Sequence, residues 1–193
     1  MTELFDYRLF LFDKGIGYNS KENLFLNRRL GYNITLNGIE IKVALKNLFI
    51  EPSLKTPQID LNCVNGELIF SGRSIPENAA ELYQSILDWI HEYSKNPRQV
   101  TNLRLNLEYF NTASSIWLAK IVKVLSAIQN SENTLMIHLY FNIDEFNNMD
   151  SEDIKDALSP IIDIIGSPTI SIGIKIYGTD SNGQILKESI ILI

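Results

Sequence analysis

A strand pattern that runs directly into a helix pattern is the feature that most constrains the fold of this 193-residue chain. Residues 103–110 alternate between apolar and polar side chains, which is the period of a half-buried β-strand. Residues 116–128 carry apolar side chains at helical spacing. Between them, residues 111–115 (Asn-Thr-Ala-Ser-Ser) are of the types that cap helix N-termini. This succession predicts an α/β fold in which helices pack on a sheet.

The same alternation of strand and helix patterns continues on both sides of this junction. Ser74, Pro76 and Glu77 form a helix-start pattern, with a hydroxyl cap, a proline in the first turn and a glutamate three residues after the serine. An acidic loop is expected at 144–153. The other predicted elements are strands at 58–63, 67–71 and 135–141 and helices at 76–95, 112–129 and 151–162. We therefore predict a mixed β-sheet with helices packed on it.

Both ends of the chain carry strand and hairpin patterns outside this region. Near the N-terminus, a strand is expected at 7–12 and a hairpin around Asn37-Gly38, because Asn-Gly favours a two-residue hairpin turn. Residues 47–57 contain two prolines and are interpreted as a linker. The terminal hairpins could pair with each other, extend the sheet or form a homodimer contact. The predicted organisation is a β-rich extension (1–46), an α/β domain (47–166) and a C-terminal β-hairpin extension (167–193).

Charge and composition exclude several classes of protein. The net charge is −6 and basic residues form no stripe, so we expect no nucleic-acid partner. A single cysteine, Cys63, excludes an internal disulfide and a multi-cysteine metal site. The N-terminal residues lack the pattern of a secretory signal, and no apolar run is long enough to span a bilayer. We expect a cytoplasmic protein without membrane insertion.

The sequence offers little support for an enzyme. His91 falls on the outer side of a predicted helix and His138 in a predicted strand, and neither lies in a nucleophile or metal-binding pattern. The acidic residues at 144–153 lack the spacing and glycine of an EF-hand. We expect no catalytic residue, no metal and no cofactor.

Thr112 lies at the start of the helix that follows the strand at 103–110. A helix N-terminus presents free backbone N–H groups and a positive dipole end, which favour an anion or a phosphate. Thr112 is therefore a candidate phosphorylation site. Considered locally, a threonine that only caps the helix is the commoner case, and both interpretations stay open.

Two longer blocks give the sequence a family resemblance. The block Gly72-Arg-Ser-Ile-Pro-Glu-Asn78 and the block Leu107-Glu-Tyr-Phe-Asn-Thr112 occur in order and at the right spacing. Together with flanking residues over roughly 48–145, they resemble the SiaC family of bacterial regulatory phosphoproteins. Ala113 stands where the family has a serine, which leaves the acceptor position untouched.

The resemblance implies a domain similar to STAS-type anti-sigma-factor antagonists that switches partners. In such a protein, a serine/threonine protein kinase phosphorylates a threonine and a PPM-type phosphatase removes the phosphate. The unphosphorylated form binds and activates a diguanylate cyclase, which links the family to cyclic di-GMP signalling. Carried onto this chain, the phosphorylated threonine is Thr112.

Several polar residues are candidates for the neighbourhood of this site. Ser114 and Ser115 are alternative acceptors or bind the first helical turn, and Asn111 is expected to satisfy backbone groups. Arg73 could hold a phosphate, with Glu77 beside it, or these two could be a loop arginine and a capping-box glutamate. The alternative function is a constitutive protein–protein adaptor or scaffold, in which Thr112 is a structural cap. A third option is a small-molecule-binding domain, which would need an apolar pocket with convergent polar groups. An exposed Thr112 hydroxyl would favour the switch.

Overall fold

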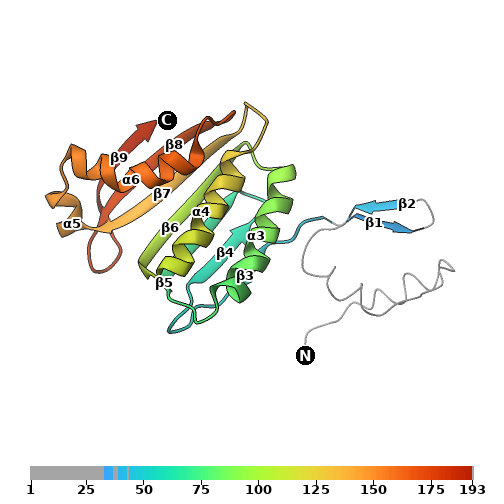
Figure 1. Ribbon diagram of the computed structural model, residues 1–193, viewed down its shortest axis with the longest axis horizontal. Coiled ribbons are helices and arrows are strands. Elements are labelled where there is room, and N and C mark those ends of the chain that lie inside the picture. The colour runs from blue at the N-terminus through green and yellow to red at the C-terminus, as the bar shows by residue number, and fades with distance from the viewer. Residues whose placement is uncertain (1–32, 37–38, 43, 193) are drawn as a thin grey trace.

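The computed structural model describes residues 33–36, 39–42 and 44–192 of the chain. Its main element is a seven-stranded mixed sheet whose strands lie side by side in chain order (Figure 1). These strands are β3 (Leu48–Ile50), β4 (Gln58–Asn62), β5 (Glu67–Ser74), β6 (Val100–Phe110), β7 (Thr134–Asn142), β8 (Ser171–Thr179) and β9 (Ile185–Leu192). The α/β class with a mixed sheet is confirmed.

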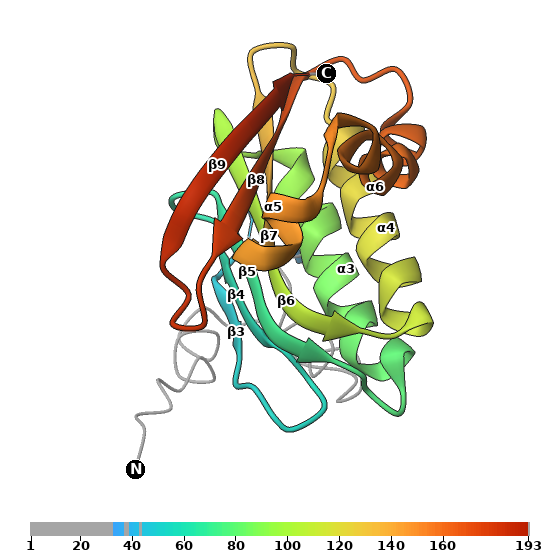
Figure 2. The same cartoon turned by 90° about the vertical axis from the view of Figure 1, so that its left-hand side faces the viewer.

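The four central strands, β5 to β8, are parallel, and antiparallel strands flank them on each side. The parallel neighbours are connected by crossovers that contain α3 (Ala79–Lys95), α4 (Thr112–Ser126), α5 (Ile143–Asn148) and α6 (Ser151–Ile165). Because each crossover advances by one strand in the same direction and such connections are right-handed, the helices collect on one face of the sheet. Figure 2 shows the sheet edge-on with the helices on that face.

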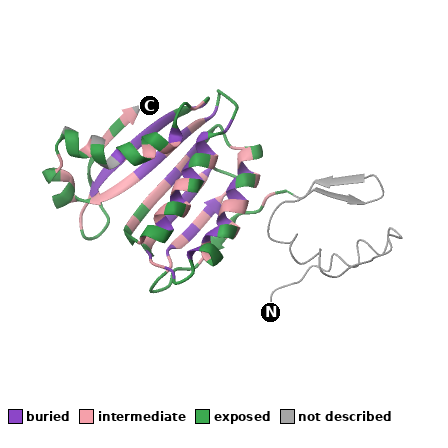
Figure 3. Cartoon of the chain, in the orientation of Figure 1, coloured by how far each residue is buried: buried purple, intermediate pink, exposed green. Residues whose placement is uncertain are grey.

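The core lies between these helices and the sheet. Alternate strand residues, including Leu68, Phe70 and Leu103, point to the helical face and are fully buried. Helix α3 contributes Tyr83 and Trp89, which are also fully buried. In Figure 3 the buried residues lie on the strands and on the inner sides of the helices, while the outer sides are exposed.

Helix α3 begins later than the sequence predicts. Its first residue is Ala79 and its N-cap is Asn78, whose side chain accepts a hydrogen bond from the Glu81 N–H. The prediction that Ser74 caps this helix is wrong, because Ser74 is the last residue of β5 and pairs with Phe110 of β6. Strand pairing and burial outweigh the local capping pattern at this position.

The acidic segment before α6 also differs from the prediction. Part of the expected loop at 144–153 is the short helix α5, which packs over β8 so closely that a Cβ on Gly178 would lie 2.8 Å from Ile143 Cδ1. Asp150 then caps α6, and its side chain and that of Asp153 form a capping box.

The terminal segments are only partly described. Strands β1 (Asn33–Leu36) and β2 (Ile39–Lys42) form the predicted N-terminal hairpin, whereas the strand expected at 7–12 lies outside the described residues. The prediction that residues 47–57 form a linker is wrong for residues 48–50. These form β3, which pairs with β4 and is an edge strand of the sheet. At the C-terminus, β8 and β9 extend the sheet, one of the three arrangements considered for the hairpins. Within the described residues, no helix combines the length and the apolar character needed to cross a membrane.

Candidate functional site

The candidate site is built at the junction between β6 and α4. Asn111 leaves the strand in an extended conformation, and its side-chain oxygen accepts a hydrogen bond from the Ser114 N–H at 2.8 Å. The first helical backbone bond runs from the Ser115 N–H to the Asn111 carbonyl at 3.0 Å. Asn111 is therefore the N-cap of α4, in agreement with the expectation that it satisfies backbone groups.

Thr112 is the first residue of α4 and is exposed to solvent. Because Asn111 is the cap, the helix does not use the Thr112 hydroxyl for that purpose. Across the described part of the chain, no hydrogen bond engages this hydroxyl. The side chain is thus positioned at the positive end of a 15-residue helix and is accessible to another molecule.

The two serines that follow have different environments. Ser114 is fully buried: its Oγ donates to the Ser74 carbonyl at 3.0 Å and accepts from Ser74 Oγ at 2.8 Å. Ser74 Oγ also lies 2.7 Å from the hydroxyl of Tyr83, and burial raises the pKa of that phenol. Ser115 is half-buried, and its Oγ donates to the Thr112 carbonyl at 2.8 Å. Ser114 therefore fastens α4 to the end of β5 and is inaccessible to a kinase.

Ser114→Ala is expected to lower the free energy of unfolding by about 1 kcal/mol, because it removes two buried hydrogen bonds but leaves the Ser74 carbonyl bonded to the Asn111 N–H. Ser115→Ala is the matched control and should change it by less than about 0.5 kcal/mol. Urea denaturation of the three proteins measures both values. Equal losses in the two variants would contradict the anchoring role of Ser114.

Arg73 and Glu77 are neither a loop arginine nor a capping-box glutamate. Arg73 lies in β5, not in a loop, at a bulge opposite Tyr109, and its Nε donates to Glu108 Oε2 at 3.1 Å. Glu77 is not a capping-box residue: it forms an ion pair with Lys55, whose hydrogen bond and charge lower the pKa of the carboxyl. Both ion pairs are exposed, so each is expected to contribute little to stability and to exchange readily with other partners.

Large apolar side chains surround Thr112 in the sequence and remain exposed. The exposed fractions are 61% for Tyr109, 48% for Phe110 and 53% for Ile116. These three side chains lie within four residues of Thr112 in the chain, and exposed large apolar side chains are candidates for contacts with another protein. We call Tyr109, Phe110, Thr112 and Ile116 the Thr112 surface. It combines an accessible hydroxyl, a helix N-terminus and apolar contact area.

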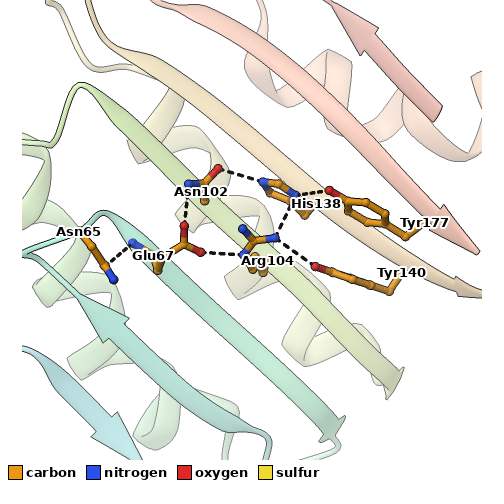
Figure 4. A network of polar contacts seen from close by, with 7 residues as sticks. All are labelled: Asn65, Glu67, Asn102, Arg104, His138, Tyr140 and Tyr177. Carbon is orange, nitrogen blue, oxygen red and sulfur yellow. Dashed lines mark hydrogen bonds and ion pairs between the residues drawn. The ribbon is translucent and has the colours of Figure 1, made fainter. Parts of the chain in front are cut away.

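A second group of polar residues lies on the other face of the sheet, away from the helices (Figure 4). Glu67 accepts hydrogen bonds from Asn102 Nδ2 at 2.7 Å and from Arg104 Nε at 2.6 Å. Nε2 of His138 lies 3.0 Å from Asn102 Oδ1, while Nδ1 of His138 lies 3.2 Å from Arg104 Nη1. The hydroxyl of Tyr177 is 3.0 Å from the same Nδ1. The network joins four adjacent strands, β5 to β8.

The donors around it determine the state of His138. Asn102 Nδ2 donates to Glu67, so the Asn102 oxygen accepts from Nε2–H of His138, and Nδ1 accepts from Arg104. Burial and the positive charges of Arg104 and Lys175 lower the pKa of His138 from 6.5 to about 4, with Glu67 opposing them. For Arg104, the hydrogen bonds of Glu67 and Tyr140 and the charge of Glu67 outweigh burial and raise its pKa. His138 is thus a neutral ring with both nitrogens hydrogen-bonded, which indicates a structural role.

This network is not among the sites predicted from the sequence. In the sequence, the network is marked by polar residues two positions apart in each of two predicted strands. These are residues 102 and 104 in one strand and residues 138 and 140 in the other. The pairing of Arg104 with His138 follows only from the register of β6 and β7. His91 is exposed on α3, as expected. In residues 44–192, no cluster of three His, Cys, Asp or Glu side chains is arranged to hold a metal ion.

Comparisons with known proteins concern the region that holds the Thr112 surface. Residues 50–165 match the family of SiaC family regulatory phosphoproteins. An uncharacterized protein of Pseudomonas aeruginosa is 26% identical over 98 residues, which cover 51% of this chain and 78% of that protein. A crystal structure of the P. aeruginosa diguanylate cyclase SiaD in complex with its activator SiaC matches with a TM-score of 0.52 and 22% identity, covering 65% of this chain and 97% of the matched chain. Apo-SiaC from the same organism matches with a TM-score of 0.49 and 24% identity, covering 66% of this chain and 98% of that one.

Proposed function

Because this chain belongs to the SiaC family of regulatory phosphoproteins, we propose that it is a non-enzymatic partner switch controlled by phosphorylation of Thr112. A serine/threonine protein kinase adds the phosphate and a PPM-type phosphatase removes it. The unphosphorylated protein binds an effector, a diguanylate cyclase or a similar protein, through the Thr112 surface. The SiaC named above as an activator of SiaD is a relative with this kind of partner.

The observation that carries the proposal is the exposed position of Thr112 on a helix that Asn111 already caps. A phosphate there would add nearly two negative charges at the positive end of α4, which the helix tolerates. The folded protein would therefore keep its structure when phosphorylated. The charge would instead change what can dock on Tyr109, Phe110 and Ile116.

The direction of the switch follows from desolvation. An effector that covers the apolar side chains of the Thr112 surface would also cover the Thr112 hydroxyl. Removing this neutral group from water costs little free energy. Covering a phosphate dianion without cationic partners costs far more, so the phosphorylated form should release the effector.

Thr112→Glu is expected to weaken effector binding at least about tenfold, because it places a charge in the contact, whereas Thr112→Ala should bind as the wild type does. Calorimetry with a purified diguanylate cyclase encoded by the same organism measures the affinities. Ser115→Glu is the matched control for charge in the same helical turn and should have a smaller effect.

A kinase assay supplies the second arm of this test. Thr112→Ala should abolish phosphate incorporation, while Ser114→Ala should retain it because Ser114 is fully buried. Equal effector affinity for the phosphorylated and unphosphorylated protein would contradict the switch and support the constitutive adaptor instead.

A further inference from the structure

An apolar cavity of about 530 Å³ lies between α4, α6 and the carboxyl-terminal halves of β6 and β7. Leu105, Leu107, Leu139 and Phe141 of the two strands line it from the sheet. The helices contribute Leu118, Ala119 and Val122 from α4 and Pro160, Ile161 and Ile164 from α6. The polar residues of the lining are Ser115, Tyr140 and Glu145. The Thr112 surface borders it only at Phe110.

The cavity exists because the helices do not fully cover the carboxyl-terminal parts of β6 and β7. Nearer the amino ends of the same strands, Leu103, Leu135 and Ile137 are fully buried. The four cavity residues of β6 and β7 point to the same face two to four positions further along, and each is only half-buried. Figure 3 shows this change along β7, from buried to half-buried. Apolar area is therefore left in contact with solvent in the centre of the sheet, where a bound molecule would remove it from water.

The size and the lining of the cavity are those of a small-molecule site. Pockets that bury most of a small ligand measure about 300–1,000 Å³ and have mainly apolar walls. Helices α4 and α6 pack against each other, so a partner helix about 10 Å wide could not pass between them to the strands. A hydrocarbon chain or an aromatic ring could.

The lining also restricts the charge of the ligand. Among the residues that line the cavity, Glu145 is the only charged one, and none is basic. A nucleotide or another phosphate would find no cation to offset its desolvation. A carboxylate head would be repelled by Glu145, and an ammonium head attracted.

We propose that this cavity binds a small amphiphile with an uncharged or cationic head, its apolar part on Leu105, Leu139 and Phe141 and its head toward Glu145. The proposal does not rest on partner switching at Thr112, because binding needs neither a phosphate nor an effector, although the cavity and the Thr112 surface share Phe110.

Three ten-carbon probes that differ only in the head test the proposal: decanol, decylammonium and decanoate. The full chain is loaded with the uncharged dye Nile red, and the fluorescence is followed while each probe is titrated below its micellar concentration or, for decanol, below its solubility limit. Decanol and decylammonium should displace the dye, and decanoate should do so about tenfold less well. Glu145→Gln should make the affinities for decylammonium and decanoate more similar.

Two variants locate the binding. Ala119→Phe fills the cavity from α4 and Ile161→Trp fills it from α6, and each should weaken decanol binding at least about tenfold. Ile116→Phe is the control, because Ile116 is exposed on α4 and does not line the cavity. Circular dichroism shows which variants fold. If neither cavity-filling variant folds, the order in which the wild-type protein binds the three probes still decides the test.

Three results would overturn the proposal. One is a wild-type protein that binds none of the three probes. Another is equal binding of all three heads, which would indicate adsorption to apolar surface. The third is displacement of Nile red by an effector protein but by no probe, which would assign the cavity to protein docking.

Discussion

Lowering the pH from 7 to 4 is expected to cost the protein about 3 kcal/mol of folding free energy through His138 alone. In the folded state the pKa of His138 is about 4, and its ordinary value is 6.5. Between these two values the unfolded chain binds a proton at this ring and the folded protein does not. Stability therefore rises with pH in this window: the contribution is present above pH 6.5 and is lost as the pH falls toward 4.

The cause is the arrangement of donors around the ring. His138 is 4% exposed, and its Nδ1 faces Arg104 Nη1 and the Tyr177 hydroxyl, so a proton on Nδ1 would break the hydrogen bond from the guanidinium. Lys175, which pairs with His138 across β7 and β8, adds a second positive charge. Protonation would thus place a third cation in a largely buried group.

Urea denaturation at a series of pH values measures this effect. His138→Gln cannot titrate, so its stability should depend less on pH between 7 and 4 than that of the wild type, whatever its stability at pH 7. His91→Gln removes the other histidine of the chain, which is exposed, and serves as the control for a His→Gln substitution outside the network. A pH dependence that is the same in all three proteins would refute the assignment to His138.

Arg104→Met should raise the pKa of His138 measured by NMR, because it removes the nearest positive charge.

Gly66→Ala is expected to lower the free energy of unfolding by about 3 kcal/mol. Gly66 ends the turn between β4 and β5 with φ at 78°, where an L-residue is strained. A Cβ at this position would lie 2.5 Å from the Val100 carbonyl oxygen. The backbone cannot easily shift to relieve the contact, because the Gly66 carbonyl accepts from the Asn102 N–H at 2.9 Å and its own N–H donates to Asn62.

Gly72 provides a matched control for the conformational part of this cost. It has a φ of 91°, and no heavy atom lies within 4 Å of the position that its Cβ would occupy. Gly72→Ala therefore carries the backbone strain without the steric contact and should cost about 1 kcal/mol. Thermal and urea denaturation of the two variants separate the cost of the backbone strain from the cost of the steric contact. Equal losses would show that the approach of Val100 contributes nothing.

Much of the fold is predictable because its signals are local. Alternating side chains and helical spacing identify the strands and helices around Thr112, and the type of residue at 111 is that of a cap. Local signals fail where a distant strand competes. Ser74 has the chemistry of a cap, but its hydroxyl instead binds Ser114, forty residues away, and the helix is capped by Asn78.

The amino-acid sequence by itself determined most of the order of strands and helices, the threonine at a helix start and the family resemblance, because periodicity, capping chemistry and the two sequence blocks are all properties of short segments. Only the tertiary structure decided which strands are neighbours and in what register. That register brings Glu67, Arg104 and His138 into one network, and the packing of α4 and α6 leaves the cavity at the carboxyl ends of β6 and β7. Pairing and packing join residues far apart in the chain, and their energy depends on the whole sheet, so no local pattern contains them.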